Sequence, residues 1–147
     1  MTDRPKSSHH TGFHLYLRNP HPAKEHHGDC ATRAACLLLD RPYGLIWAEV
    51  TEVKQWARGN RATADSGTSI NELKRSLERI TGLSWVYKSL SSGTDFHKDN
   101  LPERCIAVQA NHFVCVKDGA VWDSFDSRGK RRKQLRGYLK VRDSYTG

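Results

Sequence analysis

The order of the hydrophobic patterns constrains the fold of this chain more than any other feature, because helical patterns come first and strand-like patterns follow. The first pattern covers residues 29–39, where alanine and leucine side chains would line nearly every side of a helix. Such a segment predicts a helix that runs through the core. Asp29 is placed to cap its start, and the helix is expected to end before Pro42.

Two more helices are predicted downstream. The segment 44–58 has a helical apolar stripe, from which Lys54 is absent. That stripe consists of Ile46, Val50, Val53 and Ala57. Ser69 and Glu72 then have the spacing of a capping box, which predicts the start of a third helix that ends at Gly82. The apolar stripe of this third helix consists of Ile70, Leu73, Leu77 and Ile80.

The second half of the chain alternates between apolar and polar residues, as strands do. Asp118-Gly119 between two apolar runs predicts a β-hairpin. Residues 1–12 are polar and are expected to form a disordered tail. Strands are predicted over 83–90, 105–109, 111–117, 120–126 and 137–141, and 13–17 is a short strand or an extended arm. Helices followed by antiparallel strands predict a single α+β domain over 13–147.

Composition excludes several classes of protein. No apolar run approaches the roughly 20 residues of a membrane span, and the N-terminus lacks the apolar core of a secretory signal. The four cysteines are dispersed and contain no CxxC pair, so we expect free thiols in a cytoplasmic protein, with Cys36 and Cys115 in the core. The net charge of +8 leaves nucleic acid or another acidic molecule as a candidate partner.

Cys30 differs from the other cysteines because it lies at the predicted start of a helix. The unpaired N–H groups and the helix dipole there favour a thiolate and can also stabilise an oxyanion. A thiol nucleophile needs a base within reach and a group that orients that base. His112 is the candidate base, because it opens a strand in the apolar half of the chain.

The hairpin register selects the third group. A two-residue turn at Asp118-Gly119 pairs Cys115 with Trp122 and places Asp123 on the same face as His112, diagonally across the ladder. Asp123 is therefore predicted to orient His112. Asp126 is the alternative acid if the turn is shifted by one residue.

Together these segments resemble the papain-like cysteine peptidases. The resemblance rests on Gly28-Asp29-Cys30 opening a buried helix, on His112 opening a hairpin, and on an aspartate in the return strand. The block 29–34 and the hairpin block 112–128 are most similar to compact peptidases of bacteriophages and mobile elements and to double-glycine leader peptidases. The resemblance implies a helix carrying the cysteine packed on a C-terminal antiparallel sheet that carries the histidine and aspartate. It also implies a thiol hydrolase that cleaves a peptide, isopeptide or other amide bond through a thioester, encoded by a phage or mobile element. Deamidation and acyl transfer use the same triad and stay open.

One departure from the family concerns the oxyanion site. The family usually has a glutamine five or six residues before the cysteine, where this chain has Lys24 and Glu25. Candidate oxyanion donors or supporting residues are Lys24, Asn19, Asp29 and Asn111, with His26, His27 and the backbone N–H of Cys30 as further donors. Loss of one such donor costs about 2.7–4 kcal/mol of transition-state stabilisation.

A basic segment supports a rival function. Six of the nine residues 128–136 are basic, and without them the chain would carry about +2. This segment is either a solvated loop or a patch for nucleic acid or an acidic protein, so an inactive papain-like binding protein is the alternative to a hydrolase. The basic residues are Arg128, Lys130, Arg131, Arg132, Lys133 and Arg136. No metal or other cofactor is expected, since His21, His26, His27 and Cys30 lack metal-ligand spacing.

Overall fold

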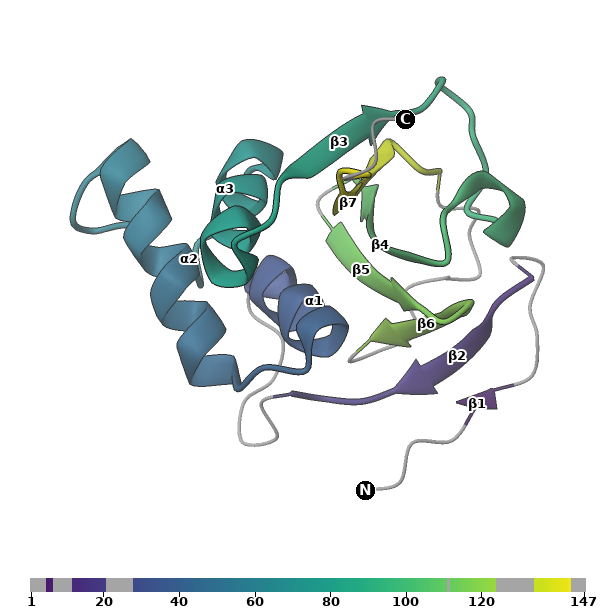
Figure 1. Ribbon diagram of the computed structural model, residues 1–147, viewed down its shortest axis with the longest axis horizontal. Coiled ribbons are helices and arrows are strands. Elements are labelled where there is room, and N and C mark those ends of the chain that lie inside the picture. The colour runs from purple at the N-terminus through teal and green to yellow at the C-terminus, as the bar shows by residue number, and fades with distance from the viewer. Residues whose placement is uncertain (1–4, 7–11, 21–27, 111, 124–133, 144–147) are drawn as a thin grey trace.

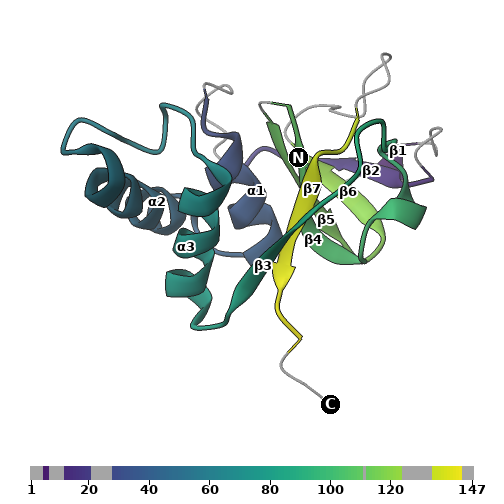
Figure 2. The same cartoon turned by 90° about the horizontal axis from the view of Figure 1, so that it is seen from above.

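The computed structural model of the chain describes residues 5–6, 12–20, 28–110, 112–123 and 134–143. These residues form three α-helices, a short 3₁₀ helix and a seven-stranded sheet (Figure 1). The helices lie together on one side of the sheet (Figure 2). No helix among the described residues is long and apolar enough to cross a membrane. The predicted α+β class is confirmed.

The three predicted helices are all present. They are α1 (Cys30–Leu39), α2 (Tyr43–Arg58) and α3 (Ile70–Thr81), and the Ser69–Glu72 capping box forms as predicted. Two details differ from the sequence analysis. Asp29 precedes α1, but its carboxylate makes no capping hydrogen bond, because it binds other side chains instead. In α2, Ala57 is exposed and Lys54 is buried.

The strands form one mixed sheet in the order β1-β2-β6-β5-β4-β7-β3. Strands β3 to β7 pair antiparallel as expected, but β2 pairs with β6 in parallel, so the sheet is mixed and is not confined to the C-terminal half. The short strand β1 also lies inside the segment 1–12 that was expected to be a disordered tail, and it pairs with β2. The strands are β1 (Pro5–Lys6), β2 (His14–Leu17), β3 (Trp85–Ser89), β4 (Arg104–Gln109), β5 (His112–Lys117), β6 (Ala120–Asp123) and β7 (Gly137–Val141). The 3₁₀ helix η1 spans Lys98–Asn100.

The β5–β6 hairpin has the predicted register. Asp118 and Gly119 have φ values of 55° and 74°, as both central residues of a type I′ turn require, and Cys115 lies opposite Trp122. Cys115 packs in the core between the sheet and the helices, whereas Val114 packs in the core on the other face. The two faces of the hairpin are therefore divided as the alternation predicts.

Candidate active site

The three predicted catalytic residues come from the ends of three elements. Cys30 is the first residue of α1, His112 is the first residue of β5, and Asp123 is the last residue of β6. Helix α1 packs on β5 and also contacts β6. The hairpin turn places the start of β5 beside the end of β6, so this packing brings the first residue of the helix to the same end of the hairpin as His112 and Asp123.

His112 lies between the other two residues. Its Nε2 atom is 3.0 Å from Asp123 Oδ2, and the two side chains are only 11% and 6% exposed. Burial lowers the pKa of His112, but hydrogen bonds to Asp123 and to Cys30 outweigh it and raise this pKa to about 9. At neutral pH, His112 is therefore an imidazolium between a carboxylate and a sulfur atom. This arrangement can stabilise a thiolate and then deliver a proton to a leaving group.

Strand β2 fixes the backbone of the acid. Leu17 pairs with Asp123 in the parallel β2–β6 ladder, and the backbone N–H of Arg18 donates to the carbonyl of Asp123 at 2.8 Å. From the sequence alone, residues 13–17 are expected to be a strand or an extended arm with no part in the site. In the structure, their strand holds the end of β6 in place.

A buried polar network anchors the start of α1. Arg33 Nε donates to Asp29 Oδ1 at 2.9 Å, and Arg33 Nη1 donates to Asn19 Oδ1 at 2.5 Å. The hydroxyl of Tyr43, at the start of α2, donates to the other carboxylate oxygen of Asp29. Asp29 and Arg33 are both almost fully buried. Two predicted residues, Asn19 and Asp29, thus lie in a network that holds the residue before Cys30, and the amide oxygen of Asn19 is bound to Arg33.

Several predicted residues lie outside the described part of the chain. These are Lys24, Asn111, Asp126, Arg128, Lys130, Arg131, Arg132 and Lys133. His26 and His27 also lie outside it. Arg136 is described and exposed, and its backbone N–H donates to Val108 at 2.8 Å.

Gln109 is a residue of this region that the sequence analysis missed. It lies directly opposite His112 in the β4–β5 ladder and is 3% exposed. Both polar atoms of its side chain are buried, and neither has a hydrogen-bond partner among the described residues. The sequence held a signal for it, because Gln109 ends one predicted strand and His112 lies near the start of the next, and adjacent strands of this kind pair antiparallel.

One of the four cysteine thiols is accessible, and the other three lie in the core. Cys36, Cys105 and Cys115 are buried, whereas Cys30 is partly exposed. Burial raises the pKa of Cys36 and of Cys105 to about 12, and burial also raises the pKa of Cys115. The prediction that Cys36 and Cys115 are core thiols is confirmed. Within the described residues, no group of three or more His, Cys, Asp or Glu side chains could hold a metal ion.

Comparison with known proteins adds no family to this geometry. A scan against protein-family models gave no match, and neither did searches of curated proteins and of solved structures.

Proposed function

We propose that this chain is a cysteine hydrolase of the papain-like type, with Cys30 as nucleophile, His112 as acid and base, and Asp123 as the group that orients His112. The observation that carries this proposal is the position of His112, which hydrogen-bonds Asp123 through Nε2 and also hydrogen-bonds Cys30. One imidazole linked to both a carboxylate and a partly exposed thiol is the arrangement that thiol hydrolysis needs.

The reaction follows from the charges at the site. The Cys30 thiolate attacks the carbonyl carbon of an amide, and N–H groups at the start of α1 receive the oxyanion. The C–N bond then breaks as His112 gives its proton to the leaving amine, which leaves a thioester on Cys30. Neutral His112 takes a proton from water, the water oxygen attacks the thioester, and the carboxylic acid leaves as the thiolate and imidazolium are restored.

The substrate class is an amide, and a peptide or isopeptide bond is our first choice. The thioester is shared by hydrolysis, glutamine deamidation and acyl transfer, which differ in the leaving group and in the final acceptor. Unfolded casein separates the three. Peptide release indicates hydrolysis of the backbone. Ammonia release with new glutamate indicates deamidation, and ammonia release with isopeptide cross-links between casein chains indicates acyl transfer. Cys30→Ala must abolish whichever product forms.

Thiol alkylation tests the proposed chemistry without a known substrate. We expect iodoacetamide to label Cys30 rapidly below about pH 7, because the imidazolium of His112 stabilises a thiolate there. The three buried cysteines serve as internal controls, and Cys30→Ala should remove the fast label. If Cys30 reacts only as an ordinary thiol does, near pH 8.5, the hydrolase proposal fails.

The concentration of basic residues in 128–136 favours a second candidate, a papain-like protein that binds an acidic partner. Charge reversal of Lys130, Arg131 and Arg132 tests it. If the triple variant loses function while Cys30→Ala retains it, the chain acts by binding and not by catalysis.

A further inference from the structure

Helix α2 presents four polar side chains along one face, at Tyr43, Trp47, Thr51 and Lys54. Their spacing of four, four and three residues places them in one row on a helix. Tyr43 binds Asp29, while the other three bind the loop 63–67. Trp47 Nε1 donates to Asp65 Oδ1 at 3.1 Å, and Thr51 Oγ1 accepts from the backbone N–H of Ala64 at 2.9 Å. Trp47, Thr51 and Lys54 thus hold the loop 63–67 along the side of α2.

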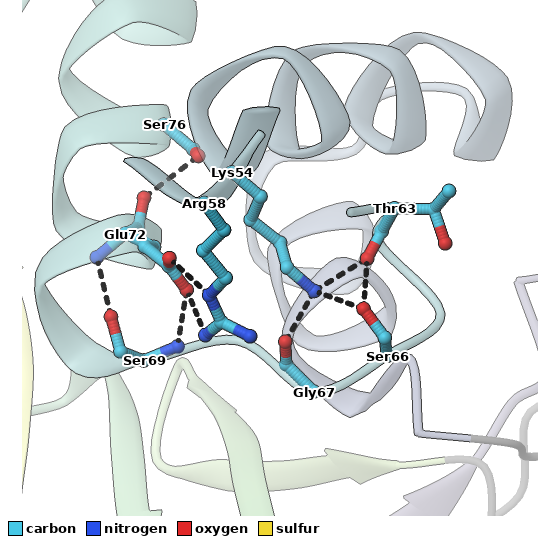
Figure 3. Close-up of polar contacts among 8 residues, drawn as sticks. All are labelled: Lys54, Arg58, Thr63, Ser66, Gly67, Ser69, Glu72 and Ser76. Atoms are coloured by element: carbon cyan, nitrogen blue, oxygen red, sulfur yellow. Dashed lines mark hydrogen bonds and ion pairs between the residues drawn. The ribbon is translucent and has the colours of Figure 1, made fainter. Parts of the chain in front are cut away.

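Lys54 makes the largest number of these contacts. Its side chain is fully buried, and Nζ donates to Ser66 Oγ at 3.0 Å and to the carbonyl oxygens of Thr63 and Gly67 (Figure 3). The three acceptors come from both ends of the loop, so a single ammonium group holds these two ends together. Arg58 lies one turn further along α2 and binds Glu72 of α3 instead of the loop 63–67 (Figure 3).

The same loop rests on the backbone beside Cys30. The N–H of Gly67 donates to the carbonyl of Gly28 at 3.2 Å. Gly28 has a φ of +72°, and a Cβ atom built on it would lie 2.6 Å from the carbonyl oxygen of Asp65. The loop and Gly28 are thus packed too closely for any side chain larger than hydrogen. A shift of the loop would move Gly28 and, two residues later, the sulfur of Cys30.

We propose that Lys54 is a positioning residue for the site: by closing the loop 63–67 against Gly28, it sets the position of Cys30 relative to His112. This inference rests on the proposed function, because it assigns Lys54 to the reactivity of the Cys30–His112 pair. It also explains why a lysine is buried on α2, where an apolar residue would leave the loop carbonyls unsatisfied.

Lys54→Ala tests the inference, with the exposed Lys88→Ala as a matched control. We expect alkylation of Cys30 by iodoacetamide at about pH 6.5 to be at least tenfold slower in folded Lys54→Ala and unchanged in Lys88→Ala. Propylammonium replaces the deleted atoms and should restore part of the rate, whereas tetramethylammonium, which has no N–H donor, should not. If Lys54→Ala fails to fold, Ser66→Ala takes its place. It removes one acceptor of Lys54 and should slow the alkylation of Cys30 by a smaller factor.

Hydrogen exchange of the Gly67 amide separates the two proposals. We expect this exchange to be at least tenfold faster in Lys54→Ala, because the bond to Gly28 loosens. If exchange accelerates while the pH profile of alkylation stays that of the wild type, Lys54 is only structural and the inference is overturned. Unchanged exchange also overturns it. If wild-type Cys30 is unreactive below about pH 7, the proposed function fails instead, whatever the loop does.

Discussion

At the scale of single residues, the charge on His112 determines what the site can do. Its pKa is raised to about 9 because the hydrogen bonds to Asp123 and Cys30 exceed the effect of burial. In the unfolded chain this pKa is about 6.5. Protonation of the ring therefore stabilises the folded state. This stabilisation is complete below about pH 6.5 and is lost as the pH rises through about 9.

The titration of His112 provides the first prediction. The imidazole NMR signals of His112 should titrate near pH 9 in the wild type and at a clearly lower pH in Asp123→Asn, which keeps the shape of the acid but removes its charge. The same variant should lower kcat/KM by about 10²-fold or more. Asp118→Asn, at the exposed turn, is the control. A His112 midpoint near 6.5 in the wild type would contradict the assigned ion pair.

Gln109 provides a second prediction at this scale. A buried amide without a partner costs about 1–3 kcal/mol. Gln109→Met should therefore raise the free energy of unfolding by about 1 kcal/mol in urea denaturation. Gln134 is exposed, so Gln134→Met should stay within about 0.5 kcal/mol of the wild type. A less stable Gln109→Met variant would show that the amide has a stabilising partner after all.

At the scale of secondary-structure elements, the site depends on how the ends of elements are held. Helix α3 begins with a complete capping box, and its Glu72 also receives two hydrogen bonds from Arg58 of α2, at 2.6 and 2.7 Å. Glu72 thus joins two helices through a single carboxylate. Burial opposes its charge, but Arg58 and Ser69 lower the pKa of Glu72 below its usual value.

This junction gives a third prediction. Glu72→Ala should reduce the free energy of unfolding by about 1–2 kcal/mol, because it removes half of the capping box and the partner of Arg58. The loss should be largest at neutral pH and shrink in acid, since a carboxylate with a lowered pKa stabilises the fold above its unfolded pKa and ceases to do so as it is protonated. Urea denaturation at two pH values measures this. Equal losses at both pH values would contradict the role of the charge.

The contact between Gly28 and the loop 63–67 gives a fourth prediction. Gly28→Ala must shift the loop, because the new Cβ atom would lie 2.6 Å from the Asp65 oxygen at a φ of +72°. We expect a loss of about 1–3 kcal/mol in stability and slower alkylation of Cys30. Gly93 has a similar φ of +87°, but no atom of the described chain lies within 4 Å of a Cβ built there, so Gly93→Ala isolates the cost of the backbone conformation. Equal effects at the two glycines would show that the loop contact is unimportant.

At the scale of the whole molecule, the elements next to one another in sequence were predictable and the distant pairings were not. The helices and the β5–β6 hairpin follow from periodicity, the capping box and Asp118-Gly119, which are local signals. The parallel pairing of β2 with β6 joins residues about one hundred positions apart, and no local pattern encodes it.

The candidate site shows the same division. Turn chemistry fixed the register of the hairpin, so the contact between His112 and Asp123 could be predicted from the sequence. The roles of Arg33 and Lys54 could not, because both are charged residues whose burial depends on partners from other segments. Buried charges of this kind violate the simple pattern of apolar inside and polar outside, and such violations concentrate near functional sites.

The pairing of Cys30 with His112 is tested most directly by the ultraviolet absorbance of thiolate as a function of pH, measured as the difference between the wild type and Cys30→Ala. We expect thiolate absorbance to be present already at about pH 6–7 in the wild type and to be absent there in His112→Ala. The three buried thiols cancel in the difference. If the absorbance of Cys30 appears only above about pH 8, in the wild type and in His112→Ala alike, the two residues do not form a catalytic pair.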